Sequence, residues 1–231
     1  MTLPLRSDGK ISIPSHIRRV KLDVGLSINA PHSHLWIQQN PNDLLVFGFE
    51  PNTSAIEQLK GLKPYDAIWP HRIDPKLIGT KLILLNCALG DCTEKVNLYI
   101  TEPDAGCSSL FLPKTIKLKS VQQVCQFRLE EFFDLFPFDQ IPYIEYLKID
   151  AQGSDLKILK GCGKYLERVV YVTAEPEESA YLNVQNSLAQ IQEYMTSMGF
   201  EKISHPNTVD PTFVNSKFLS EAQSIYICQI G

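Results

Sequence analysis

Residues 146–161 read Tyr146-Leu-Lys-Ile-Asp-Ala-Gln-Gly-Ser-Asp-Leu-Lys-Ile-Leu-Lys-Gly161. The apolar run at the start of this segment ends in the carboxylate of Asp150, and the glycine at position 153 interrupts the pattern. A helical pattern begins at once, with Ser154 or Asp155 as its cap. Its apolar stripe consists of Leu156, Ile158 and Leu159. The segment therefore predicts a buried strand, a tight turn and a helix.

The turn of this unit lies at the carboxyl end of its strand, which is the edge where open α/β sheets bind ligands. The simpler interpretation is an ordinary connection in which an aspartate caps the helix. The choice between a ligand site and a plain turn depends on what the other predicted strands carry at the same edge.

Four further apolar runs are typical of buried strands, and three of them end in an acid. These runs are residues 17–26 with Asp23 and Gly25, 44–52 with Glu50, 81–91 with an exit turn at 88–91, and 168–176 with Glu175. Helical patterns separate several of them. Alternating strands and helices predict a mostly parallel sheet with helices on both faces. Right-handed connections then bring all the strand-to-helix turns to one edge, where these acids should converge in a single cleft.

Local signals place the helices. Pro31 suits the first turn of a helix, with Asn29 as a candidate N-cap and Asn40 near its end. Further helices are expected at 54–62, at 129–136, and at 188–198 before Gly199.

The remaining strands and connections are predicted from weaker hydrophobic periodicity. Strands are expected at 95–101 and 117–128, and the last two strands at 200–204 and 224–230, joined by a polar loop at 205–223. Irregular connections are expected at 63–80 and 102–114.

Size and composition indicate one globular domain. The chain has 231 residues, of which 44% are hydrophobic and 21% charged. We expect an irregular arm over residues 1–16, punctuated by prolines, and a single domain over 17–231. The net charge of -4 argues against a general nucleic-acid binder, which needs a basic surface.

Targeting signals are not evident. No apolar run approaches the roughly 18 residues that a membrane span needs, and the first twenty residues lack the apolar centre of a signal peptide. The six cysteines show no C-x-x-C pair, which favours reduced thiols within the core. We therefore expect a cytoplasmic protein without a membrane span.

The predicted cleft suits a nucleoside ligand. Gly25 allows a close turn beside a ligand, and the helix after it offers free N–H groups. Glu50 follows that turn by about 25 residues, the offset typical of an acid that binds ribose hydroxyls. The turn itself reads Asp23-Val-Gly-Leu-Ser-Ile-Asn29 and lacks the glycines that a pyrophosphate requires. S-adenosylmethionine is therefore favoured over NAD.

Several motifs resemble those of the FkbM family of methyltransferases. They are Asp23-Val-Gly25, Phe49-Glu-Pro-Asn52, Asn86-Cys-Ala-Leu-Gly-Asp91, Ser108-Ser-Leu110, Leu147-Lys-Ile-Asp-Ala-Gln-Gly-Ser-Asp155 and Leu159-Lys-Gly161. The resemblance spans residues 18–204 in order. It implies a Rossmann-like class I methyltransferase fold, with a seven-stranded mostly parallel sheet and an antiparallel last strand. It also implies an O-methyltransferase that uses S-adenosylmethionine and acts on a hydroxyl of a sugar, a glycan or a secondary metabolite.

The resemblance also implies roles for individual residues. Asp23, Gly25 and Ser27 would line the methionine end of the cofactor, Glu50 would hold the ribose with Asn52 nearby, and Ala88 and Leu89 would flank adenine, with Asp91 reaching its amino group. The chain departs from the usual D-V-G-A-N-x-G pattern, because Leu26, Ser27 and Asn29 stand at the variable positions.

Asp150 is our first candidate for a catalytic role beside the transferred methyl, as a base or a positioning group, and Glu175 could share that work. A divalent metal between the two acids is a less favoured alternative. His32, His34 and His71 are further candidate bases, although a packing or surface role is the simpler interpretation of each. Lys114, Lys117 and Lys119 suit either an anionic acceptor or a solvated strand face.

Two other functions compete with methyl transfer. One is a catalytically inactive cofactor-binding module that serves as an interaction surface, and the other is a nicotinamide-dependent oxidoreductase.

Overall fold

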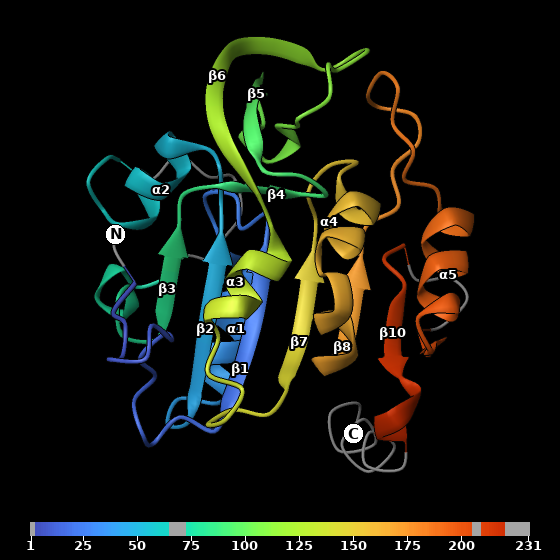
Figure 1. Ribbon diagram of the computed structural model, residues 1–231. Helices are drawn as coiled ribbons and strands as arrows, with labels where there is room; N and C mark the ends of the chain where they lie inside the picture. Colours follow the sequence, from blue (N-terminus) through green and yellow to red (C-terminus); the bar gives the residue numbers. More distant parts are fainter. Residues whose placement is uncertain (1–2, 65–72, 205–208, 220–231) are drawn as a thin grey trace.

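A computed structural model describes residues 3–64, 73–204 and 209–219. Within them, a seven-stranded sheet in the order β3-β2-β1-β7-β8-β10-β9 runs through the molecule (Figure 1). Its strands are β1 Arg19–Val24, β2 Leu44–Phe49, β3 Leu82–Leu85, β7 Ile144–Ile149, β8 Val169–Ala174, β9 Phe200–Lys202 and β10 Thr212–Asn215. The five strands from β3 to β8 in this order pair in parallel, and β10 is antiparallel to both its neighbours. The predicted mostly parallel sheet with an antiparallel last strand is confirmed.

Helices cover both faces of this sheet, as predicted (Figure 1). Side chains of α3, α4 and α5 pack into the larger core, whereas those of α1 and α2 pack into the core on the opposite face. Alternation along β2 explains the division, because Leu45 and Phe47 belong to the first core and Leu44 and Val46 to the second. The helices are α1 Pro31–Gln39, α2 Thr53–Leu59, α3 Leu129–Leu135, α4 Asp155–Gly161 and α5 Leu188–Ser197, with short 3-10 turns η1 Pro75–Leu77, η2 Ala105–Cys107, η3 Gly163–Arg168 and η4 Ser216–Phe218.

The start of one helix differs from expectation. Helix α1 begins at Pro31 as predicted, but its N-cap is Ala30, in the left-handed conformation, and not Asn29. In α4 the N-cap is Ser154, one of the two predicted caps, although its hydroxyl makes no capping bond, and Asp155 is the first helical residue.

A second sheet lies above the carboxyl edge of the first (Figure 1). It consists of β4 Ala88–Gly90, β5 Glu94–Glu102 and β6 Lys117–Arg128, in the order β4-β6-β5. The prediction that residues 88–91 form only an exit turn was wrong, since β4 pairs in parallel with the end of β6. Ala88, Leu98, Ile100 and Val124 give this sheet a small core of its own.

The prediction of a polar loop over 205–223 was also wrong, because β10 lies inside it, between β8 and β9. Phe213 and Val214 are buried there. Two apolar residues are too short a run to stand out among polar neighbours. The strand predicted at 224–230 lies outside the described residues.

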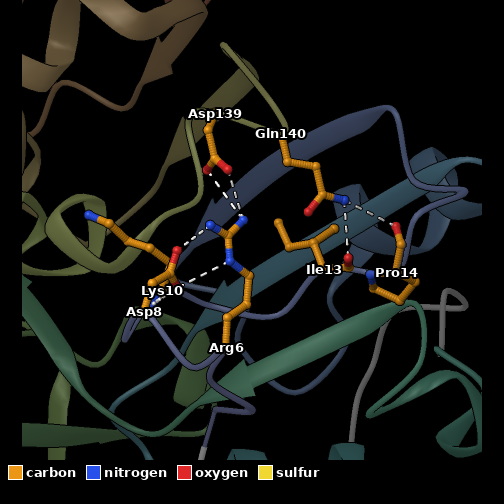
Figure 2. A network of polar contacts seen from close by, with 7 residues as sticks. All are labelled: Arg6, Asp8, Lys10, Ile13, Pro14, Asp139 and Gln140. Carbon is orange, nitrogen blue, oxygen red and sulfur yellow. Dashed lines mark hydrogen bonds and ion pairs between the residues drawn. The ribbon is translucent and has the colours of Figure 1, made fainter.

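The described part of the segment before β1, residues 3–18, forms no helix or named strand and is held against the domain (Figure 2). Ile11 and Ile13 are buried in the larger core. Arg6 contacts Asp139 at 3.0 Å, and Gln140 donates to the carbonyl oxygen of Ile13 at 3.1 Å. The arm therefore completes the core beside α3.

Two further observations concern the sequence predictions. Among the described cysteines, Cys162 is buried, but Cys92 and Cys125 are exposed, so the expectation that the cysteines are core residues holds only in part. None of the described helices is long and apolar enough to cross a membrane.

Candidate active site

A cavity of about 750 Å³ lies at the carboxyl ends of the central strands. The second sheet and the segment around η2 form its other wall. Eight of the predicted site residues line it: Gly25, Ser27, Glu50, Asn52, Ala88, Leu89, Asp150 and Glu175. Asp23 and Asp91 do not line it. The predicted convergence therefore holds for the first eight residues and not for the last two.

Gly25 is the point where three strands meet. Its N–H donates to the carbonyl oxygen of Phe49 at the end of β2 at 2.9 Å. Its φ is +78°, and a Cβ at this position would lie 1.8 Å from the backbone oxygen of Asp150 at the end of β7. Only glycine fits both the left-handed backbone and this contact. The close approach draws the ends of β1, β2 and β7 together at the floor of the cavity.

The turn after Gly25 is held in an unusual conformation. Ser27 and Ala30 have φ values of 56° and 40°, which residues other than glycine seldom adopt. The N–H of Ser27 donates to a Glu50 carboxylate oxygen at 2.8 Å, which holds the turn against β2. Left-handed residues held in this way are common at ligand sites.

Glu50 lies at the tip of β2 and is only 6% exposed. Its two carboxylate oxygens accept the N–H groups of Ser27 and Asn52, each at 2.8 Å. Burial raises the pKa of Glu50 to about 7, although these two bonds oppose the shift. Each oxygen can still accept a second hydrogen bond from a ligand. Asn52 caps α2 through its side chain, so its position is fixed by the helix.

Asp23 is buried beneath the turn and binds α1. One of its carboxylate oxygens accepts the N–H of Ser33 at 3.1 Å and its hydroxyl at 2.6 Å. The other oxygen, Oδ1, is buried and has no hydrogen-bond partner among the described residues. Asp23 therefore supports the turn from below.

Asp91 is exposed on the bend between β4 and β5. Its neighbour Gly90 packs against α4, where a Cβ on Gly161 would lie 2.0 Å from the Gly90 carbonyl oxygen. This contact explains the glycine of the Leu159-Lys-Gly161 motif. It also places Ala88 and Leu89 against the cavity.

Asp150 is held by two neighbours on its own turn. Lys148, which is 5% exposed, donates to its Oδ2 at 2.9 Å, and Gln152 donates to its Oδ1 at 2.9 Å. Burial acts to raise the pKa of Asp150, but the charge of Lys148 and these hydrogen bonds outweigh it and lower the pKa to about 2. Burial acts to lower the pKa of Lys148, but the charges of Asp150 and Asp23 outweigh it and raise the pKa. Both groups are therefore charged at neutral pH.

Glu175 lies on the tip of the adjacent strand β8, where Gln152 also donates to its Oε2 at 2.8 Å. Burial and the neighbouring Asp150 raise the pKa of Glu175 to about 9, so this acid holds a proton at neutral pH. Its N–H donates to the fully buried Asp155 at 2.8 Å, and Ala151 donates to the same carboxylate at 3.2 Å. Asp155 thereby fixes the β7 and β8 tips relative to α4.

Sequence reasoning gave no role to Lys148, Gln152 or Tyr181, and it gave Asp155 only the role of a candidate helix cap. Lys148 had a usable signal, because a lysine within an apolar strand two positions before an acid needs a charged partner. Gln152 and Tyr181 had none, since their hydrogen bond joins residues that are 29 positions apart.

The other candidates occupy different places. His32 is exposed at the edge of the cavity and lines it, while His34 does not line it, and His71 lies outside the described residues. Lys119 lines the cavity, whereas Lys117 forms an exposed ion pair with Glu102. The described residues contain no group of three or more His, Cys, Asp or Glu that could hold a metal ion.

The comparison with protein-family models identifies one family. The family model described as "Methyltransferase FkbM domain" matches residues 29–202. Among solved structures, methyltransferase FkbM from Methylobacillus flagellatus KT aligns with 92% of this chain and 46% of its own, with a TM-score of 0.50 and 15% identity. The N-terminal domain of human METTL16 in complex with SAH aligns with 87% of this chain and 62% of its own, with a TM-score of 0.42 and 10% identity.

The chain thus spans about half the length of the Methylobacillus protein. Comparison with curated proteins gave no significant match.

Proposed function

The chain belongs to the FkbM methyltransferase family, and on this premise we propose that it is an O-methyltransferase that uses S-adenosylmethionine. The proposed acceptor is a hydroxyl of a sugar, a glycan or a secondary metabolite. The observation that carries the proposal is the single cavity that Gly25, Glu50 and Asp150 share at the carboxyl ends of three adjacent strands.

The residues of the cavity fit this cofactor. The Glu50 carboxylate retains acceptor positions for the ribose hydroxyls. Ala88 and Leu89 offer apolar surface for adenine, and the charged Asp150 suits a positively charged ligand. The volume of about 750 Å³ lies within the range typical of small-molecule sites.

The turn that follows Gly25 disfavours NAD as the ligand. A pyrophosphate needs glycines so that the backbone can approach it closely. Ser27 and Asn29 line the cavity at positions where such glycines would stand.

When bound, S-adenosylmethionine supplies an electrophilic methyl group on a positively charged sulfur. The contribution of the protein is then to align the acceptor oxygen, which is worth roughly 7–11 kcal/mol of the barrier. Asp150 remains a carboxylate at neutral pH, so it can accept a hydrogen bond from the acceptor hydroxyl and orient it. A carboxylate whose pKa is about 2 is a weak base, which favours positioning over proton removal by Asp150.

Calorimetry with S-adenosylmethionine and with NAD tests the cofactor. We expect micromolar binding of S-adenosylmethionine and no binding of NAD. Binding of NAD alone would overturn the proposal in favour of an oxidoreductase.

Transfer of labelled methyl to a panel of hydroxylated acceptors tests the activity. We expect Asp150→Asn to reduce turnover by about 10²-fold with the fold intact, because the acceptor loses its orienting carboxylate. Asp91→Asn is the matched control, since Asp91 is an exposed acid outside the cavity, and turnover should be unchanged. Cofactor binding without transfer to any acceptor would instead indicate an inactive binding module.

A further inference from the structure

Gln152 joins the tips of two strands through one amide group. Its Nε2 donates to Oδ1 of Asp150 at 2.9 Å and to Oε2 of Glu175 at 2.8 Å. The two acids end the adjacent strands β7 and β8, so a single side chain spans both. Two carboxyl groups repel each other when both are charged, and a donor between them offsets that repulsion.

The position of Gln152 is itself fixed. Its φ is 50°, a left-handed backbone conformation that residues other than glycine seldom adopt. Its carbonyl oxygen accepts a hydrogen bond from the Ser109 hydroxyl at 2.7 Å. Ser109 is buried in the segment that follows η2. The wall of the cavity that carries Ser109 thus holds the backbone of Gln152 in its unusual conformation.

Tyr181 determines which end of the amide faces the acids. Its ring is fully buried, and its hydroxyl donates to Oε1 of Gln152 at 2.8 Å and to the carbonyl oxygen of Cys107 at 2.7 Å. The hydroxyl has a single proton, which the two carbonyl oxygens share as a three-centre hydrogen bond. With its oxygen turned to Tyr181, the amide can present only its N–H groups to Asp150 and Glu175.

We propose that Gln152 is a positioning residue that holds the carboxyl groups of Asp150 and Glu175 as one proton-sharing pair, and that Tyr181 fixes the orientation of its amide. The catalytic value of the pair rests on the proposed function, since Asp150 is the group that orients the acceptor. The geometry of the pair does not depend on that function.

The charges around the pair set its titration. Ionisable groups that influence one or both acids come from every neighbouring element, namely Lys148, Asp155, Asp210, Glu50, His32, Cys107 and Tyr181. Burial and Asp150 raise the pKa of Glu175 to about 9. Burial also acts to raise the pKa of Asp150, but Lys148, Glu175 and Gln152 outweigh it and lower the pKa to about 2. Separating the two acids should therefore bring their pKa values closer together.

The test is a carbon-13 NMR titration of the side-chain carboxyl groups in the full-length protein without cofactor. Signals of the two acids are identified by their loss in Asp150→Asn and Glu175→Gln. In Gln152→Gly, whose backbone accepts the left-handed conformation, we expect the two midpoints to move toward each other by about one pH unit or more. Gln122→Ala is the matched control, because Gln122 also lines the cavity but donates to Thr53 and Pro51.

Tyr181→Phe keeps the buried ring and removes the hydroxyl. We expect it to shift the midpoints in the same direction in the native background and to add nothing in the Gln152→Gly background. Unchanged midpoints in Gln152→Gly would overturn the positioning role, even if its melting temperature fell. An equal effect of Tyr181→Phe in both backgrounds would overturn the role given to Tyr181.

Should Gln152→Gly fail to fold, Tyr181→Phe alone tests the proposal. A shift of the two midpoints toward each other would support it, and unchanged midpoints would overturn it. The titration needs neither cofactor nor acceptor. A failure of methyl transfer therefore leaves its result intact, and a failure of the titration leaves the proposed function intact.

Discussion

Gly25 carries the closest approach between two strand ends in the site. A Cβ at this position would lie 1.8 Å from the oxygen of Asp150, and φ is +78°. We expect Gly25→Ala to lower the free energy of unfolding by more than the roughly 1–3 kcal/mol that a left-handed backbone alone costs. Denaturant unfolding measures this loss.

Gly199→Ala separates the two causes, because its φ is +80° and a Cβ there meets nothing within 4 Å. It should show the backbone cost without the clash. Equal losses in the two variants would contradict the close approach at Gly25.

Glu50 links cofactor binding to pH. We expect Glu50→Ala to weaken S-adenosylmethionine binding by about 1–3 kcal/mol, because ribose hydroxyls lose their charged acceptor. Burial raises the pKa of Glu50 to about 7, so the carboxyl is largely protonated at pH 6 and charged at pH 8. Affinity measured by calorimetry should therefore rise about tenfold from pH 6 to pH 8.

Glu50→Gln is the control for this pH dependence. It keeps the shape of the side chain but cannot titrate, and any titration of the ligand itself affects both proteins equally. If the variant kept the full tenfold change, the assignment of Glu50 to the ribose would be contradicted.

At the scale of elements, the packing of α4 on β4 connects the two sheets. Alanine in place of a helical glycine is usually stabilising by about 1 kcal/mol. At Gly161 the opposite is expected, because a Cβ would lie 2.0 Å from the Gly90 carbonyl oxygen. Gly161→Ala should cost about 1–3 kcal/mol in unfolding free energy and also weaken cofactor binding, since β4 carries Ala88 and Leu89.

Lys160→Ala, at the exposed neighbouring position of α4, should change stability by less than about 0.5 kcal/mol. A stabilised Gly161→Ala variant would show that α4 and β4 do not pack as closely as described.

At the scale of the whole molecule, the arm before β1 contributes to stability and not to the site. Ile11 is 1% exposed, and no residue from 3 to 16 lines the cavity. We expect Ile11→Ala to cost about 2–5 kcal/mol of unfolding free energy while the cofactor affinity stays the same. Leu5→Ala is the matched control, because Leu5 lies in the same arm and is 54% exposed. A loss of affinity in folded Ile11→Ala protein would connect the arm to the site.

Strands and helices that leave a pattern within one short stretch of the chain were predictable from the sequence. The strands that end at Glu50, Asp150 and Glu175 are short apolar runs followed by an acid, and α5 is a clear period of three and four. Local periodicity reflects which face of an element is buried, so it survives in one sequence without any knowledge of neighbours. Right-handed connections then sufficed to bring the acids to one edge.

Features that depend on partners distant in the chain appeared only with the fold. Strand β4 exists because it pairs with β6, some forty residues later, and β10 because β8 and β9 flank it. Asp23 turned away from the cavity because Ser33 binds it, and the Gln152 amide is oriented by Tyr181. Pairing and side-chain direction are decided by the competition among all available partners in three dimensions, and a linear pattern of residue types does not record which partner wins.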